Sequence, residues 1–339
     1  MTAYGFRRLP TPDWSSINGS YDRTVAQTRE WCKFIADTQH AELVVLQVLQ
    51  DQGPVGWFTG LIVNKFGLRI LGSPFPGWTT SYMGFNLSKE IARTEVLPSL
   101  FGYAFRELKC AHVEVMDRRI PVNEVVRLGL KHRVFRGYEV DLTRDEDTLF
   151  DAMDSSCRRC IRKAEKSSVT VEVAQDEAFA DEYYDQLREV FARQRLVPTY
   201  PVARVRSLVR NVLPTGNLLL LRARDSKGKC IASGVFPACN DTMYFWGGAS
   251  RTEYRHLRPN ETIQWYAMRF WKSRGIAKYD MGGAGAYKEK YGGHSIAVPW
   301  VRQSRNGLLA AMREAARWSF GLRQRISGIG QKAEKDDED

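Results

Sequence analysis

The sequence predicts an α/β (α+β) fold in which one structural unit occurs twice. The chain has 339 residues, enough for two domains that each bury a core. Residues 43–53 and 218–228 match at a constant offset of 175 residues, each with an apolar run, a short turn and a glycine. In both copies a second strand, a turn, a third strand and a long helix follow. A final strand then ends at Met116-Asp117 or at Tyr279-Asp280. An antiparallel meander followed by a helix and a strand that joins the same sheet defines this fold class.

The first copy is expected to occupy residues 1–144. Short apolar runs bounded by turn residues predict strands at 43–49, 55–63, 68–71, 111–116 and 138–142. Helices are expected near residues 20–36 and from about residue 88 to 109. The first three strands follow one another through short turns, so they should form an antiparallel meander.

The second copy is expected at residues 145–305, with a mixed, mostly antiparallel sheet flanked by helices, as in the first copy. Its predicted strands are 169–173, 218–222, 231–236, 243–246, 276–279 and 296–301. Helices are predicted at about 147–166 and 177–195, after Pro201, and at 261–274 with Asn260 as the N-terminal cap. A cleft between two such units is a natural place for a substrate.

The last segment, residues 306–339, is expected to contain a basic amphipathic helix and an acidic tail. Within residues 307–326, apolar side chains fall near one helical face, flanked by Arg313, Arg317, Arg323 and Arg325. Such a helix can pack on the preceding domain or lie on an anionic membrane surface. Both alternatives stay open at this point.

Composition limits the class of protein and its partners. Hydrophobic content of 43% and charged content of 26% are typical of soluble globular proteins. The first residues resemble no signal peptide, so we expect a cytoplasmic protein, or one held peripherally at the inner face of the membrane. The net charge of +11 favours polyanionic partners. Six scattered cysteines complete no metal-binding set, so no metal is expected.

Residues 278–293 are the stretch in which chemistry is expected. A short strand ends at Asp280, glycines follow at 282, 283 and 285, and then come Tyr287 and Lys288. Glycines permit a sharp turn and a close approach of ligand to the backbone. An acidic side chain and a lysine around such a turn suit a cleft with anionic contents. The competing interpretation is a strand end with a solvated lysine.

Several motifs of the second half resemble the Fem family, whose enzymes have two GNAT (acetyltransferase) domains in tandem and add amino acids from aminoacyl-tRNA to peptidoglycan precursors. They are the basic run 159–166 before a valine-rich strand, Tyr-Phe-Trp-Gly-Gly-Ala-Ser at 244–250, residues 254–260, Trp265 with Met268, and residues 279–293. The resemblance covers about 150 residues. This chain has Tyr287 where the family usually has Phe, and a shorter loop between the glycine pair and the lysine.

The resemblance implies N-acylation of an amine. The sequence shows no Ser-His-Asp motif, so direct attack by the amine is expected. Family and position together suggest roles for particular residues. Lys288 is implied in catalysis, where positive charge relieves the developing oxyanion or leaving group. Asp280 orients the attacking amine or caps its own turn. Substrate contacts are expected from Tyr287, Arg195 and Tyr200, the last two flanking Val197-Pro198. Tyr244 and Trp246 share one face of a strand, as core packing or as a substrate wall.

The junction at residues 255–260 bears on the donor. Coenzyme A-dependent GNAT proteins grip the pyrophosphate with a glycine-containing loop at a helix N-terminus. Here Arg255, Arg258 and Asn260 stand at that junction and it contains no glycine. We therefore expect aminoacyl-tRNA as donor, with Arg162 and Lys163 of the basic helix in its footprint or on a solvated face.

Three functional hypotheses follow. The preferred one is aminoacyl transfer to a cell-envelope precursor or another small amine-bearing metabolite, with no cofactor beyond the co-substrate. The second is an acyl-CoA-dependent N-acyltransferase of the same fold. The third is a non-catalytic basic module that binds RNA or an anionic surface. No oligomeric state is expected in preference to another.

Overall fold

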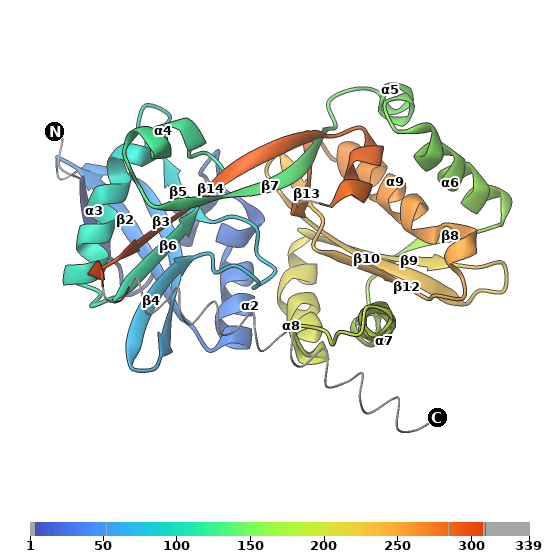
Figure 1. Cartoon of the computed structure of the whole chain (residues 1–339), viewed down its shortest axis with the longest axis horizontal. Coiled ribbons are helices and arrows are strands. Elements are labelled where there is room, and N and C mark those ends of the chain that lie inside the picture. Colours follow the sequence, from blue (N-terminus) through green and yellow to red (C-terminus); the bar gives the residue numbers. More distant parts are fainter. Residues whose placement is uncertain (1–3, 52, 284, 308, 310–339) are drawn as a thin grey trace.

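The computed structural model describes residues 4–51, 53–283, 285–307 and 309, without the side chain of Ala286. Its two halves lie side by side, and two long strands run between them (Figure 1). The elements of the first half are β1 (Tyr4–Arg8), α1 (Trp14–Asn18), η1 (Val25–Gln27), α2 (Arg29–Gln39), β2 (Glu42–Gln50), β3 (Gly53–Lys65), β4 (Leu68–Ser73), β5 (Gly84–Leu87), α3 (Arg93–Arg106), β6 (His112–Met116), α4 (Val122–Arg127) and β7 (His132–Asp141).

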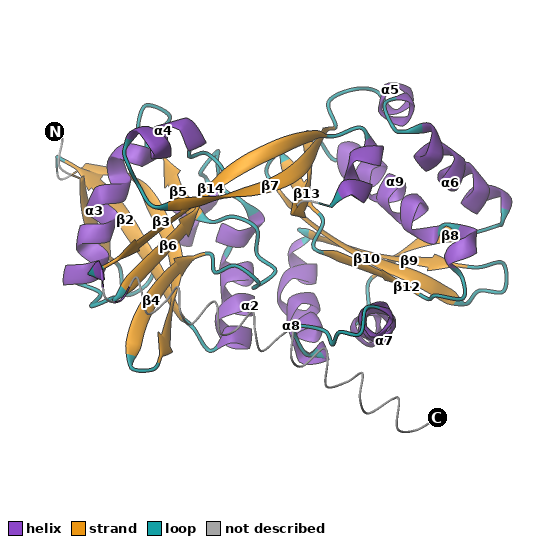
Figure 2. Ribbon diagram, in the orientation of Figure 1, coloured by secondary structure: helices purple, strands orange, loops and turns teal. Residues whose placement is uncertain are grey.

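The second half continues with helices on both faces of its strands (Figure 2). Its elements are α5 (Glu146–Asp151), α6 (Ser155–Lys166), β8 (Thr170–Ala174), α7 (Ala178–Arg193), α8 (Val202–Val212), η2 (Leu213–Thr215), β9 (Leu218–Arg224), β10 (Cys230–Cys239), β11 (Thr242–Tyr244), β12 (Gly247–Ser250), η3 (Arg255–Leu257), α9 (Pro259–Lys272), β13 (Lys278–Gly283), η4 (Ala286–Tyr291) and β14 (His294–Ser304).

The strand order confirms the duplication. In the first half β2 pairs antiparallel with β3, β3 antiparallel with β4, and β4 parallel with β6. In the second half β9, β10, β11 and β13 repeat this pattern of directions. A short extra strand also pairs with the second strand of each meander, β5 on β3 and β12 on β10. The 175-residue offset therefore marks two copies of one mostly antiparallel unit.

The last strand of each half belongs to the sheet of the other half. The strand β7 pairs with β13 of the second half, whereas β14 pairs with β6 of the first half. The two exchanged strands also pair antiparallel with each other, from His294–Glu139 to Val301–His132. One continuous sheet of 14 strands therefore passes through both halves. We call this arrangement the strand exchange.

Further contacts hold the halves together beside the strand exchange. Helix α2 packs against α8, as Figure 1 shows near the centre of the molecule. Arg204 of α8 donates from Nη2 to the carbonyl oxygen of Trp78 at 2.6 Å. The Asn240 side chain donates to the carbonyl of Arg23 at 2.8 Å. These hydrogen bonds fix the walls of the space between the halves.

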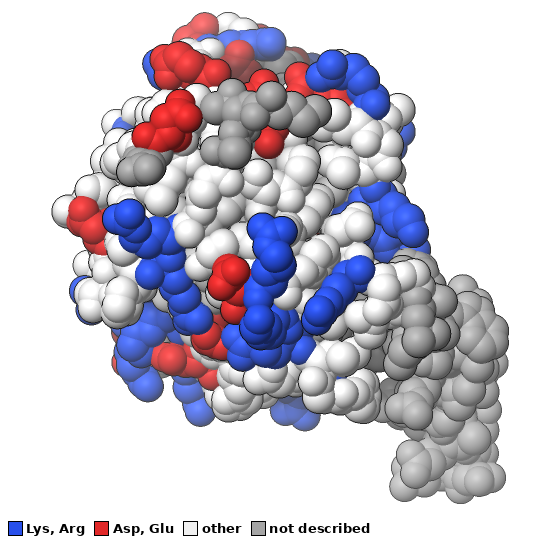
Figure 3. All heavy atoms as spheres, turned by 90° about the vertical axis from the view of Figure 1, so that its left-hand side faces the viewer, with Lys and Arg blue, Asp and Glu red and all other residues white. Residues whose placement is uncertain are grey.

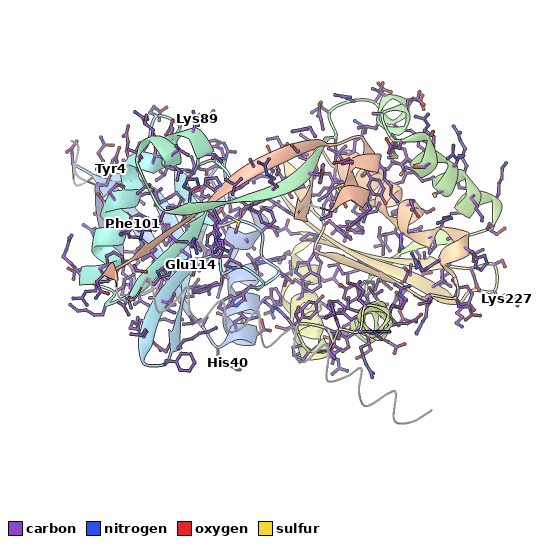
Figure 4. All side chains as sticks on the ribbon, in the orientation of Figure 1. Tyr4, His40, Lys89, Phe101, Glu114 and Lys227 are labelled. Carbon is purple, nitrogen blue, oxygen red and sulfur yellow. The ribbon has the colours of Figure 1, made fainter. Side chains whose placement is uncertain are left out.

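Basic and acidic side chains are mixed on the end face of the first half. Figure 3 shows this face, where Lys and Arg side chains gather with Asp and Glu among them. Figure 4 shows the side chains inside, including the buried Phe101, which lies on α3 in the first-half core, and Glu114 on β6. Among the described helices, none has the length and apolarity needed to cross a bilayer.

Several sequence predictions need correction. The helix expected at 147–166 is broken into α5 and α6, because the amide of Asp154 leaves the helix and donates to the carbonyl of Lys290 at 2.9 Å. Asn260 is not the cap of α9: the helix begins at Pro259, with Arg258 as the cap in the left-handed region. The strand β12 was not predicted, since glycines fill half of it.

The predicted boundary near residues 144–146 falls between β7 and α5 and stays a prediction. The predicted helix at 307–326 lies outside the described residues, apart from 307 and 309.

Candidate active site

A cavity of about 520 Å³ lies between the two halves. Its walls come from η1 and α2, the loop after β4, the strand exchange, the β10–β12 region and the turn after β13. Aromatic and other apolar side chains dominate, and among the described residues that line it Lys288 alone is charged. The aromatic and charged members are Trp31, Tyr82, Phe135, Tyr244, Phe245, Trp246, Lys288 and Trp300. We call this space the aromatic cavity.

The cavity opens where β10 changes partners. Residues 232–235 of β10 pair with β12, but Ala238 and Cys239 pair with β11. Pro237, which has no amide hydrogen to donate, lies between these two pairings and lines the cavity. The backbone then crosses the gap: Phe245 donates to the carbonyl of Asp280 at 2.9 Å and Trp246 to that of Val235 at 3.1 Å. This divergence points residues 244–246 at the space between the halves.

Lys288 is buried at the cavity wall. It lies on η4, is 8% exposed, and donates from Nζ to the carbonyl oxygen of Gly283. Burial lowers the pKa of Lys288, while the negative charge of Asp280 works in the opposite direction. No carboxylate of the described residues forms an ion pair with Lys288. The turn that aims it depends on Gly282, whose φ of +73° favours glycine. The interpretation of this residue as a solvated lysine is thus at odds with its burial.

Asp280 lies fully buried behind the cavity wall, at the junction of the halves. One carboxylate oxygen accepts from the amide of Gly282 at 2.7 Å, so the side chain caps its own turn. The other faces Arg118 of the first half, at 3.4 Å from Nη1. Burial raises the pKa of Asp280 to about 6, although Arg118 pulls it down. Its carboxyl group therefore changes charge close to neutral pH.

Two residues predicted as a core surface or a substrate wall, Tyr244 and Trp246, both line the cavity. The indole Nε1 of Trp246 is buried and has no hydrogen-bond partner. A buried donor without a partner costs free energy, and a ligand in the cavity can satisfy it. The hydroxyl of Tyr82 also lines the cavity and lies beside Asp280, whose pKa it lowers.

The other predicted substrate residues do not line the cavity. Tyr287 is 52% exposed, next to Lys288. Tyr200 is buried behind Trp246, with ring centroids 5.5 Å apart, and its hydroxyl lies 3.2 Å from that of Tyr183. Arg195 is exposed in the loop after α7, with a φ of +57°. Their substrate contacts stay predictions.

The predicted donor-binding residues form a separate group on the second half. Arg255 and Arg258 are exposed at the start of α9, and Asn260 donates from its side chain to Ser250 Oγ at 3.2 Å. The first helical residue is Pro259, which supplies no amide hydrogen. Arg162 and Lys163 are exposed on α6, which packs beside α9. None of these five residues lines the aromatic cavity.

Sequence reasoning missed the residues that the first half contributes. Arg118 links Asp280 to Glu139, forming ion pairs with both carboxylates, and Tyr82 stands between Asp280 and the cavity. One signal was available for Arg118. It follows Asp117, which occupies in the first copy the strand-end position of Asp280.

The second half of the chain contains a GNAT acyltransferase domain. Residues 152–291 match the family model described as an acetyltransferase (GNAT) domain, which places this domain in the half that carries Lys288. Among solved structures, FemX superposes with a TM-score of 0.70 at 13% identity, covering 87% of this chain and 97% of that one. The tandem-GNAT, Fem-like fold is thereby established.

Two further structures share the fold. The C-terminal domain of a putative lysylphosphatidylglycerol synthetase from Agrobacterium fabrum has a TM-score of 0.56 at 11% identity, over 89% of this chain and 94% of that one. A tandem GNAT protein from the clavulanic acid biosynthesis pathway has a TM-score of 0.51 at 10% identity, over 90% and 99%. A search among curated proteins gave no match.

Proposed function

We propose that this acyltransferase moves an aminoacyl group from aminoacyl-tRNA to the amine of a cell-envelope precursor or another small metabolite, by direct attack. The observation that carries the proposal is Lys288, a buried cation without a carboxylate partner at the wall of the aromatic cavity. Such a charge stabilises negative charge that develops on the oxyanion or on the leaving oxygen. Its lowered pKa also suits donation of a proton to the leaving group.

The amine that attacks must lose a proton, and Asp280 is a carboxylate just behind the cavity wall, next to the lining residues 281–283. It is buried between Arg118 and Gly282, and its pKa of about 6 leaves it mainly ionised at neutral pH. A carboxylate in that state orients an ammonium group or accepts its proton. Arg118 keeps the carboxylate in place through the opposite oxygen.

The lining of the aromatic cavity favours an uncharged acyl group. It contains no carboxylate among the described residues, so a lysyl or arginyl side chain would have no counter-ion there. Lys288 would repel the same side chains. Aromatic rings and the donors of Tyr82 and Trp246 suit an acyl group that is apolar or weakly polar.

The start of α9 supports a tRNA donor over coenzyme A. Pro259 at the first helical position and the engaged side chain of Asn260 leave few donors for a pyrophosphate. Exposed Arg255, Arg258, Arg162 and Lys163 suit an extended polyanion. The structural neighbour titled lysylphosphatidylglycerol synthetase bears the name of an aminoacyl-modified lipid, which fits this preference.

The second candidate is an acyl-CoA donor in the same cavity. The observation that favours it is the match of residues 152–291 to the acetyltransferase (GNAT) domain. The non-catalytic alternative is disfavoured by the GNAT domain and by the burial of Lys288.

The donor experiment compares aminoacyl-tRNA and acetyl-CoA on the purified chain. We expect turnover with a tRNA charged with a neutral amino acid, weak binding of coenzyme A, and tRNA affinity that falls linearly with the logarithm of salt concentration. Replacing both Arg162 and Lys163 by Gln should make that slope shallower by about 2, because two phosphate contacts are lost. Tight stoichiometric acetyl-CoA binding without any effect of tRNA would instead establish the second candidate.

A further inference from the structure

We propose that a second, charged pocket binds an anionic group of the acceptor, a carboxylate or a phosphate, beside the amine that is acylated. This inference rests on the proposed function and deepens it. The pocket has a volume of about 210 Å³ and lies between the halves. Its charged lining residues are Asp22, Arg23, Asp117, Arg118, Arg119, Asp241 and Lys278, and we call it the charged pocket.

All three carboxylates of the charged pocket already have cationic partners inside the protein. Arg93, behind the pocket, forms ion pairs with both Asp22 and Asp117. Lys278 forms an ion pair with Asp241 at 2.8 Å. Arg93 balances only one of its two carboxylate partners, but burial raises the pKa of Asp117 and so favours its neutral form. With every carboxylate already in an ion pair, a cationic ligand gains little from them.

Two of the arginines have no such partner. Arg23 donates to the side-chain oxygen of Asn18, but its Nε is buried and has no hydrogen-bond partner. Arg119 lies with its guanidinium 5.1 Å from the centre of the Tyr21 ring. Neither forms an ion pair with a carboxylate of the described residues. The unsatisfied donor of Arg23 and two guanidinium groups outside any carboxylate ion pair are complementary to a small anion.

The charged pocket adjoins the aromatic cavity. Thr24 and Tyr244 line both spaces and so form their common wall. Arg118 lines the charged pocket while pairing with Asp280, and residues 281–283 after Asp280 line the cavity. An acceptor that places its anion on Arg23 and Arg119 therefore extends a neighbouring amine past Thr24 and Tyr244 into the aromatic cavity, toward the acyl carbonyl near Lys288.

The volume of the charged pocket limits the kind of ligand further. A space of about 210 Å³ is smaller than the usual pocket for a drug-sized molecule. It accommodates a carboxylate or one phosphate with a short carbon chain. The acceptor class is thus a small amine with an anionic group close to its nitrogen.

The first experiment measures anion binding by the full chain without any donor. Calorimetry with inorganic phosphate and with acetate should show binding to the wild type that is weakened about tenfold in Arg23→Gln and in Arg119→Gln, since a hydrogen bond to a charged group is lost in each. The matched control is Arg7→Gln, which removes an equal charge from an exposed position on β1 and should bind as the wild type does. Melting curves verify that each variant folds. If Arg23→Gln does not fold, anion binding by Arg119→Gln tests the proposal, because Arg119 is exposed.

The second experiment measures acyl transfer to ethanolamine, phosphoethanolamine and glycine. We expect KM for an anionic amine to be about tenfold below that of ethanolamine in the wild type, and this preference to disappear in both pocket variants. A lower KM for phosphoethanolamine identifies phosphate as the bound group, and a lower KM for glycine identifies carboxylate.

The two experiments separate the inference from the function on which it rests. Equal anion binding by the wild type, both pocket variants and Arg7→Gln would overturn the charged pocket as a site. Transfer that ignores the charge of the amine would overturn the acceptor assignment and leave the acyltransferase activity intact. If anions bind as expected and neither donor is used with any amine, the proposed function fails while the anion site stands.

Discussion

At the residue scale, the main question is what a buried lysine does without a carboxylate. Burying a charged group costs free energy, and the hydrogen bond from Lys288 to the carbonyl of Gly283 offsets only part of this cost. We predict that Lys288→Met lowers kcat about a hundredfold, on the order of 3 kcal/mol of transition-state stabilisation, because the stem is kept and the charge is lost. Steady-state kinetics with donor and acceptor varied separately measure this effect.

The control for this prediction is Lys288→Arg, which should rescue activity only in part, because a planar guanidinium cannot take the position of the ammonium. Melting temperatures of both variants should stay near that of the wild type. A higher KM with unchanged kcat in Lys288→Met would show that the lysine only binds substrate.

The raised pKa of Asp280 leads to a prediction about the pH dependence of the reaction. Its pKa is raised to about 6, so the carboxyl group is neutral below this pH and ionised above it. If the ionised form positions or deprotonates the amine, kcat/KM rises as the pH increases through about 6. In Asp280→Asn the residual rate should lose this inflection. An inflection that persists near pH 6 in the variant would assign it to another group.

The raised pKa of Asp280 makes the stability of the protein fall with increasing pH, whereas kcat/KM rises. A carboxyl group whose pKa is higher in the folded state binds its proton more tightly there. Its contribution to the free energy of unfolding therefore falls as the pH rises from its unfolded value near 4 toward 6. Activity at neutral pH is thus obtained at some cost in stability, which Asp280→Asn should relieve.

The sequence contained part of this site. Asp280 and Lys288 both lie in one glycine-rich stretch of 16 residues, 278–293, so the local pattern was enough to select them. Arg118, Tyr82 and Arg23 come from the other half of the chain. Their roles depend on how the two halves of the sheet join. The spacing of residues within a short segment does not show which distant residues will meet in the fold.

At the scale of elements, η4 positions Lys288 and is itself anchored by the turn at Gly292. This glycine has a φ of +78°, and an added Cβ would come within 2.8 Å of the carbonyl oxygen of Ala152. We predict that Gly292→Ala lowers the free energy of unfolding by about 1–3 kcal/mol more than Gly67→Ala does. Gly67 is the matched control, because its φ is +75° but nothing lies within 4 Å of its Cβ position.

Chemical denaturation of both variants tests this prediction, and activity assays should show that Gly292→Ala also lowers kcat. Equal destabilisation by the two substitutions would mean that the turn can move away from Ala152.

Elements with strong local patterns were predicted well, and those that depend on distant partners were not. The apolar runs of β2, β3, β9 and β10 lie close to their predicted bounds. The break between α5 and α6 escaped prediction because it follows from a hydrogen bond to residue 290, far along the chain. Likewise β7 begins six residues before its predicted start, since His132–Gly137 extend along β14.

At the scale of the whole molecule, the strand exchange couples the stability of the two halves. Removing β7 would expose one edge of β13, and removing β14 would expose one edge of β6. We predict that the chain unfolds in one cooperative transition, with the far-ultraviolet circular dichroism and tryptophan fluorescence curves coinciding. Two separated transitions would mean that each half folds independently despite the exchange.

The strand exchange also has a consequence for the order in which the protein is made. The strand β6 is synthesised early, but β14, which covers one of its edges, ends only at Ser304. At about 5–20 residues per second, a ribosome needs roughly 8 to 30 s to extend the chain from the end of β7 to that point. Throughout this interval the nascent first half presents an open edge to its neighbours on the same messenger RNA, where unpaired strands can associate wrongly. Slow or stalled translation between β7 and β14 should therefore endanger the first half of the protein, although all of its own residues except those of β14 have already been added.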